Sequence, residues 1–120
     1  MRNTRLTLLH MITGVFIAAL LGIHMVIAHL DDILIFFGVE AADPTSWESM
    51  MGRASQGIWT GLYVALLALV LYHGLYGLRG IILEVTSSAR IARIITRAFI
   101  VIGISTFAWG TYVSVALFSS

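Results

Sequence analysis

Three long stretches of this sequence contain no Asp, Glu, Lys or Arg: residues 6–30, 54–78 and 98–120. A helix needs about 20 apolar residues to cross the ~30 Å hydrocarbon core of a bilayer. Helix is the expected form, because backbone N–H and C=O groups find no water to bond inside a bilayer. The sequence therefore predicts an all-α membrane protein with three transmembrane helices, at about residues 6–30, 54–79 and 97–119.

The rest of the chain forms two connections, at residues 31–53 and 80–96, within a single membrane domain of residues 1–120. Only 11% of the residues are charged and 59% are hydrophobic, which leaves no room for a soluble catalytic domain. We expect no nucleic-acid partner. The absence of cysteine excludes thiolate iron–sulfur ligation, cysteine zinc sites and disulfides on this chain. The first stretch is too long for a signal peptide and lacks a small-residue cleavage site, so we expect it to stay as a helix.

The arginines indicate how the helices are oriented, since the chain has no lysine. Six of the seven arginines lie before the first stretch or between the second and third: Arg2, Arg5, Arg79, Arg90, Arg93 and Arg97. The connection at residues 31–53 carries one arginine and five acidic residues. Because positive residues remain on the cytoplasmic side, the pattern predicts a cytoplasmic N-terminus and an outer C-terminus.

Both connections carry further signals. In the outer connection the apolar run 33–37 is expected to lie in the membrane interface or to continue the first helix, and Asp43-Pro44 predicts a turn. In the inner connection Arg90, Arg93 and Arg97 are spaced by three and four residues, which places them on one helical face. That face suits anionic lipid or a docked soluble subunit.

Small residues recur at a spacing of four in the first two predicted helices. They are Gly14, Ala18 and Gly22 in the first helix, and Gly57, Gly61 and Ala65 in the second. Such faces are typical of close helix packing in membranes. The same clearance also suits a flat cofactor, and both interpretations remain open at this stage.

The four histidines are His10, His24, His29 and His73. Histidine inside a transmembrane segment is rare and marks functional sites, although a hydrogen-bonded packing role is the simpler alternative. At 100° per residue His10 and His24 share one stripe of the first helix, whereas His29 is turned away at its outer end. Imidazoles at depth in apolar, glycine-rich surroundings favour haem over a bare metal ion.

Depth separates the two strongest candidates for iron ligands. His24 lies about 18 residues beyond the inner end of the first helix, whereas His73 lies about five residues short of the inner end of the second. At 1.5 Å per residue their depths differ by roughly 20 Å, too far for the two to share one haem iron. They could bind two haems at different depths, with the other ligands supplied by a partner chain.

Two motifs resemble the membrane-anchor cytochrome b subunits of succinate dehydrogenase and fumarate reductase, the respiratory complex II family. The family motif Ser-x-x-His-Arg-x-Ser/Thr-Gly appears here as Thr7-Leu-Leu-His10-Met11-Ile-Thr13-Gly14. The family motif His-x-x-x-Gly-x-Arg-His, followed by an aspartate, appears as His73-Gly-Leu-Tyr-Gly77-Leu-Arg79-Gly80, ending at Glu84. The sequence departs from the family at Met11, Gly80 and Glu84.

The resemblance implies a role for each motif residue. His73 would be an axial ligand of haem b, and His24 a second axial ligand where two haems are present, with Gly77 clearing space for the ring. Thr7 would help to bind quinone, and His10 would lie near a haem propionate or the quinone. Arg79 would serve the propionates or the interface with the iron–sulfur subunit.

The resemblance also implies the partners and the activity. The chain would be part of a multi-subunit helix bundle with a flavoprotein, an iron–sulfur protein and a second membrane-anchor chain, surrounded by membrane lipid. It would bind haem b and help form the quinone site of a succinate:quinone oxidoreductase, without itself catalysing the dicarboxylate chemistry of the tricarboxylic acid cycle. Electrons would pass between the iron–sulfur subunit and membrane quinone. No transit peptide is visible, so the cytoplasmic membrane of a prokaryote is expected.

Two alternatives remain. The chain could be a haem-free structural anchor of the same kind of complex, with its histidines in packing or in hydrogen bonds to quinone. It could also be the haem-b anchor of another quinone-linked enzyme, such as a formate dehydrogenase or a hydrogenase. Those anchors have four or more helices, which argues against this second alternative.

Overall fold

A computed structural model describes residues 4–119 and shows a wholly helical chain across that range. Three helices are long and apolar enough to cross a membrane: α1 (Thr4–Ala28), α4 (Gly57–Glu84) and α5 (Ala89–Ser119). Two short helices, α2 (Leu30–Phe36) and α3 (Trp47–Ala54), lie in the connection between α1 and α4. The prediction of an all-α membrane protein with three transmembrane helices is confirmed.

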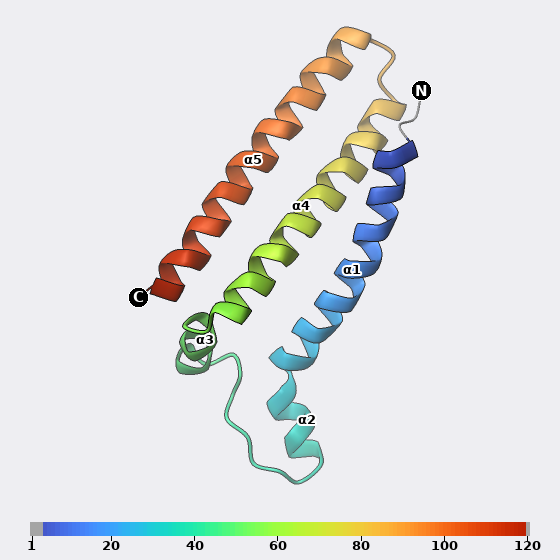
Figure 1. Cartoon of the computed structure of the whole chain (residues 1–120). Helices are drawn as coiled ribbons and strands as arrows, with labels where there is room; N and C mark the ends of the chain where they lie inside the picture. The colour runs from blue at the N-terminus through green and yellow to red at the C-terminus, as the bar shows by residue number, and fades with distance from the viewer. Residues whose placement is uncertain (1–3, 120) are drawn as a thin grey trace.

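The three long helices form a layer with α4 in the middle (Figure 1). Helix α4 packs against α1 on one side and α5 on the other, whereas α1 and α5 do not pack on each other within residues 4–119. The molecule measures 59 × 33 × 21 Å, and the smallest dimension is close to two helix diameters. The described part of the chain buries Thr13 and Pro44 only, and leaves large apolar side chains exposed along every long helix.

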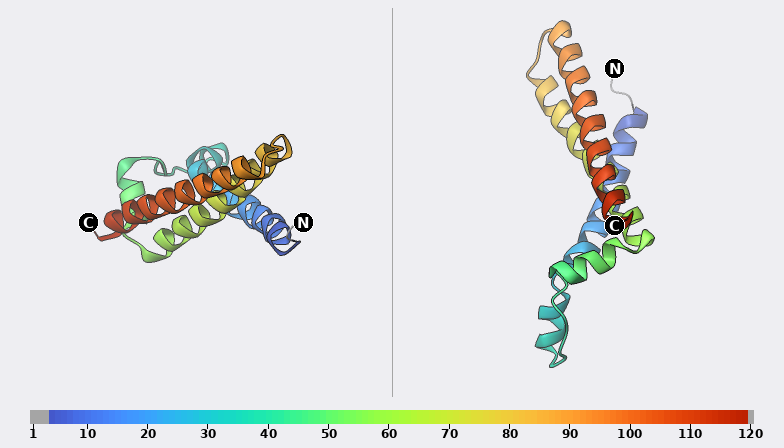
Figure 2. Two further views of the ribbon diagram at one scale, coloured as in Figure 1. Left: turned by 90° about the horizontal axis from the view of Figure 1, so that it is seen from above. Right: turned by 90° about the vertical axis from the view of Figure 1, so that its left-hand side faces the viewer.

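The N-terminal end of α1 and the α4–α5 connection lie at one end of this layer (Figures 1 and 2). The C-terminal end of α5 lies at the other end, beside α3. Arg5, Arg79, Arg90, Arg93 and Arg97 therefore belong to the end that carries the N-terminus. Arg2 lies outside the described residues. This placement supports the charge asymmetry from which the sequence predicts a cytoplasmic N-terminus.

The helix α5 begins well before the expected span at 97–119. It starts at Ala89, so the connection between α4 and α5 comprises only residues 85–88. Ser88 lies directly before the helix and its Oγ accepts a hydrogen bond from the backbone N–H of Ile91 (3.4 Å), as an N-terminal cap does. The arginines mark where the apolar membrane segment ends, but arginine is a good helix former and the helix continues through them. As predicted, Arg90, Arg93 and Arg97 share a helix.

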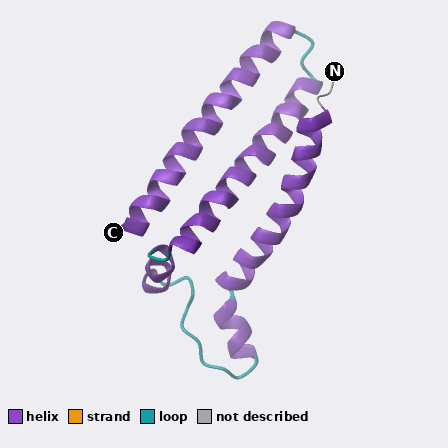
Figure 3. Ribbon diagram, in the orientation of Figure 1, coloured by secondary structure: helices purple, strands orange, loops and turns teal. Residues whose placement is uncertain are grey.

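The connection between α1 and α4 contains two short helices separated by a loop (Figure 3). Helix α2 follows α1 after a single non-helical residue, His29, so the apolar run 33–37 nearly continues the first helix. Gly38 ends α2 with a positive φ of 78°. The N–H of Gly38 bonds to the carbonyl of Ile35, and the N–H of Val39 bonds to that of Leu34. These two bonds form a Schellman motif, in which glycine is favoured.

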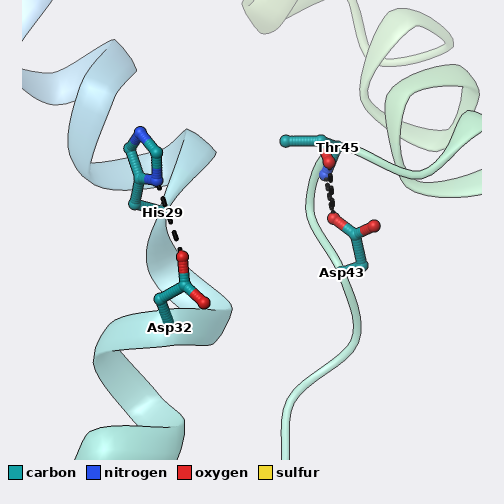
Figure 4. A network of polar contacts seen from close by, with 4 residues as sticks. All are labelled: His29, Asp32, Asp43 and Thr45. Carbon is teal, nitrogen blue, oxygen red and sulfur yellow. Dashed lines mark hydrogen bonds and ion pairs between the residues drawn. The ribbon is translucent and has the colours of Figure 1, made fainter.

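The predicted turn at Asp43-Pro44 leads into α3. The Asp43 carboxylate accepts hydrogen bonds from Oγ1 of Thr45 (2.6 Å) and from its backbone N–H (2.8 Å). Ser46 then caps α3 by accepting a bond from the N–H of Ser49 (3.3 Å). Figure 4 shows this turn and, beside it, the contact between His29 and Asp32. Nδ1 of His29 lies 3.7 Å from Oδ2 of Asp32.

Acid should weaken the Asp43 turn. The hydrogen bonds from the Thr45 side chain and backbone lower the pKa of Asp43, because they stabilise the charged carboxylate. Because the pKa of Asp43 is lower in the folded state, its carboxylate stabilises the fold at pH values above the ordinary aspartate pKa of about 3.9. This stabilisation is lost as the pH falls through the folded-state pKa. Carboxyl-carbon NMR titration should therefore give Asp43 a midpoint below that ordinary value. Thr45→Ala should move the midpoint upward, and an unchanged midpoint in that variant would contradict the assignment.

Candidate functional site

The imidazoles of His10 and His73 stack on each other between α1 and α4. Their ring centroids are 4.0 Å apart and their planes are inclined by 11°. Each histidine also lies over a glycine of the opposite helix. A Cβ added at Gly14 would lie 3.0 Å from Cε1 of His73, and one added at Gly77 would lie 3.2 Å from Cε1 of His10. The space cleared by Gly77, which the sequence analysis assigns to haem, is filled on this side by the His10 ring.

The pair has a reciprocal sequence pattern. His10 precedes Gly14 by four residues on α1, and His73 precedes Gly77 by four residues on α4. Residues four apart lie on the same face of a helix. Because α1 and α4 run in opposite directions (Figure 1), each histidine meets the glycine of the other helix. Close approach of the two backbones at glycine therefore makes room for both rings.

A hydrogen bond sets which ring nitrogen of His73 carries the proton. Its Nδ1 lies 3.0 Å from the backbone carbonyl oxygen of His10. A carbonyl oxygen only accepts, so Nδ1 carries the proton and Nε2 keeps its lone pair. Thr13 donates to the same carbonyl (2.8 Å), and its Oγ1 lies 3.4 Å from Nδ1 of His73. Thr13 itself is buried, with 5% of its surface exposed.

This arrangement is the one that metal-binding histidines use. A ligating imidazole usually donates its other ring N–H to a carbonyl or carboxylate, which fixes the ring and presents the free nitrogen to the metal. Nε2 of His73 has no hydrogen-bond partner among residues 4–119 and is not among the buried unpaired atoms. Part of its surface is therefore exposed. The residues present would fit a histidine that binds the iron of a haem through Nε2.

His10 is not suited to be the opposite ligand of the same iron. Two axial nitrogens each bind at about 2 Å from opposite sides of the metal, whereas these two rings lie face to face at 4.0 Å. Nδ1 of His10 is buried without a partner, so Nε2 is the ring nitrogen that a ligand could reach. The ring of Tyr76 covers His10 from α4, with centroids 5.3 Å apart.

A second bond joins α4 to α1 beside this pair. The hydroxyl of Tyr72 donates to the backbone carbonyl of Leu6 (3.0 Å). Thr7 lies one turn before His10 on α1, at the same end of the helix pair. Met11, which stands where the family motif has arginine, is 64% exposed and contributes no cation to this end of α1. The structure thus places Thr7, His10 and His73 in one region.

His24 lies in a different part of the molecule. Its ring meets the edge of the Tyr63 ring, with centroids 6.4 Å apart and planes at 83°. Tyr63 precedes His73 by ten residues on α4, a rise of about 15 Å. The structure therefore keeps His24 and His73 at different depths, in agreement with the sequence analysis. His10 and His24, which the sequence places on one stripe of the first helix, both face α4.

A cavity of about 380 Å³ lies beside His24, at the end of the layer that carries α3. It is bounded by α1, α4 and α5, and also by α3 and the preceding turn, which contribute Arg53 and Thr45. An Nη atom of Arg53 donates to the carbonyl of Pro44, while its Nε is buried without a partner. The role of His24 as a second haem ligand stays a prediction, and this cavity is where it would be tested.

Arg79 faces the opposite side of α4 from the histidine pair. Its Nε donates to Oγ1 of Thr96 on α5 (2.9 Å). Both residues border a groove of about 440 Å³ between α4 and α5. The structure brings Arg79 together with α5 rather than with His10. The predicted contact of Arg79 with haem propionates stays a prediction.

Comparisons with known proteins agree with this architecture. Residues 3–112 match the family model of the succinate dehydrogenase/fumarate reductase transmembrane subunit. The chain belongs to this family. It is a membrane-anchor subunit of the succinate dehydrogenase/fumarate reductase type, and with three apolar helices it is a multi-pass membrane protein that works with partner subunits.

A curated relative supports the assignment. The chain is 29% identical, over 100 residues, to the succinate dehydrogenase hydrophobic membrane anchor subunit of Thermoplasma acidophilum. The alignment covers 83% of this chain and 75% of that protein. No solved structure matches.

Sequence reasoning missed the contact between His10 and His73 and the part that Thr13 plays in it. The signal was present: the pattern His-x-x-x-Gly occurs in both helices, close to the inner end of each. Two antiparallel helices bring such patterns to the same depth. The depth of His73 is informative when it is compared with that of His10, and not only with that of His24.

The glycines under the two rings can be tested by substitution. Gly14→Leu should destabilise the α1–α4 pair by about 1–3 kcal/mol, because the added side chain would overlap the His73 ring. Gly22→Leu on the same helix is the matched control, since a Cβ there meets nothing within 4 Å. Denaturant unfolding of the protein in detergent would measure both changes. Equal changes in the free energy of unfolding for the two variants would show that the contact between Gly14 and the His73 ring does not contribute specifically to stability.

Proposed function

We propose that this chain binds haem b through His73 and helps form the quinone site of a succinate:quinone oxidoreductase. The observation that supports the proposal is the hydrogen bond from Nδ1 of His73 to the carbonyl of His10, which leaves Nε2 free and accessible. A bound haem b would supply one-electron redox chemistry, with a potential tuned by axial ligation and burial. The second axial ligand would come from a partner membrane-anchor chain.

The residues around His73 have supporting roles in this proposal. Thr13 and the His10 carbonyl hold the imidazole in one tautomer and one orientation. The stacked His10 ring and Gly14 limit its movement from either side. These contacts keep Nε2 aimed at one point, which reduces the rearrangement needed when the iron binds.

The quinone would bind near the inner end of α1. Nε2 of His10 is the ring nitrogen that a quinone oxygen could reach, and Thr7 lies one turn away. The cation needed to polarise a quinone oxygen would come from the partner chain, because Met11 occupies the position of the family's arginine. Electrons would pass between the iron–sulfur subunit, docked at the arginine-rich end, and the membrane quinone.

Replacing His73 tests the haem assignment. The purified complex should show a b-type band in its reduced-minus-oxidised spectrum, and His73→Ala should abolish or shift that band because a ligand is lost. Free imidazole should restore part of the band in the folded variant by entering the space that the ring leaves. His29→Ala is the control, since His29 lies beyond the end of α1. An unchanged spectrum in the His73 variant would refute the ligand assignment, and a complex with no band would favour the haem-free anchor.

We also propose that the arginine-rich end faces the cytoplasm of a prokaryotic cell. Five described arginines lie at that end of the layer, which the positive-inside rule places in the cytoplasm. Alkaline phosphatase fused after the C-terminus should be active, because it would fold outside the cytoplasm. The same reporter inserted within residues 85–88 should be inactive, and the reverse pattern would invert the topology.

A further inference from the structure

The groove between α4 and α5 is open to the surroundings and almost wholly apolar along its length. Its wall on α4 runs from Ala68 to Arg79, and its wall on α5 runs from Thr96 to Phe107. Leu71 and Leu75 line one side, and Phe99 and Ile100 line the other. A groove of this kind fits a hydrocarbon chain.

The length of the groove corresponds to one leaflet. From Ala68 to Arg79 the helix rises by about 16 Å, and half of a ~30 Å hydrocarbon core is about 15 Å. The groove also begins at the level of Arg79, at the arginine-rich end of the layer. An acyl chain lying in it would span its own leaflet, with its headgroup beside the arginine.

The mouth of the groove is positively charged and not neutralised by the chain itself. Arg79 uses Nε to hold Thr96, and no arginine of the described chain takes part in an ion pair. Arg93 does not line the groove itself, but it lies one turn before Thr96 on α5 and is rotated from it by about 60°, which places it just beyond the mouth on the same side of the helix. Arg90 is rotated from Thr96 by about 120° and lies further from the groove.

We propose that the α4–α5 groove is a binding site for an anionic phospholipid of the arginine-side leaflet. One acyl chain lies between Leu75 and Phe99, and the phosphate accepts hydrogen bonds from the guanidinium groups of Arg79 and Arg93. Guanidinium suits this role because its planar donors match two phosphate oxygens. A neutral quinone in the same groove would leave both cations uncompensated, and the acidic surface of a soluble subunit would leave the apolar length uncovered.

Lipid retention by the intact purified complex tests this site. The complex is exchanged into detergent, incubated with vesicles of phosphatidylglycerol or of phosphatidylcholine, re-isolated, and analysed for bound phospholipid by native mass spectrometry. Phosphatidylglycerol should be retained in preference to phosphatidylcholine. Arg93→Gln should lower the affinity for phosphatidylglycerol about fivefold, as expected for one arginine near an anionic lipid. Arg90→Gln removes the same charge from the same helix and should have a smaller effect.

A second pair of variants tests the apolar part. Ala68→Phe fills the deep end of the groove and should lower retention while leaving Arg79 and Arg93 in place. Ala98→Phe is the matched control, since Ala98 is exposed and about 200° around α5 from Thr96.

Three outcomes would overturn the proposal: equal retention of the two lipids, equal effects of Arg93→Gln and Arg90→Gln, or no effect of Ala68→Phe. Loss of the soluble subunits from the Arg93→Gln complex with unchanged lipid retention would assign that arginine to subunit docking instead.

Discussion

The hydrogen bond from the His73 ring to the backbone carbonyl of His10 is the interaction on which the arrangement of α1 and α4 depends. It ties a side chain of one helix to the main chain of the other, so it specifies both the depth and the rotation of the two helices. The stacked rings require a glycine opposite each of them, and both are present at Gly14 and Gly77. The same bond leaves Nε2 as the free nitrogen. The packing of α1 on α4 and the tautomer of His73 are therefore set by one contact.

The layered shape explains why this contact is important for the pairing of α1 with α4. Three helices side by side cannot enclose a core, and no hydrophobic side chain of the long helices is buried among residues 4–119. Apolar burial between helices is a weak driving force in a bilayer, where lipid tails solvate leucine as well as another helix does. Specific hydrogen bonds and close approach at small residues therefore determine how the helices pair. The exposed faces are available to lipid and to the partner chains of the complex.

Much of this fold follows from the sequence by elementary rules. Uncharged stretches located α1, α4 and α5, and the turn at Asp43 follows from its dipeptide with proline. The small residues were only partly informative. Gly14 and Gly77 lie in the contact between α1 and α4, whereas a Cβ at Gly22 or Gly61 would meet nothing within the described chain. A spacing of four identifies a face of a helix without identifying what covers it.

The rest required the relative rotation of the helices. Nothing in the spacing of His73 and Arg79 states which neighbour each meets, since α4 has α1 on one side and α5 on the other. The structure turns His73 towards α1 and Arg79 towards Thr96. The start of α5 at Ala89 was also hidden, because a helix can extend beyond the membrane where its composition becomes charged.

The short connection at residues 85–88 has a consequence for how the protein is made. Four residues between two long helices keep α4 and α5 together as a tight hairpin, whereas α1 is separated from α4 by residues 29–56. His10 and His73 are 63 residues apart in the sequence, so the contact between them can form only after most of α4 has been synthesised. The contact between the two histidines therefore forms late in synthesis, and it depends on the placement of a helix that was made much earlier.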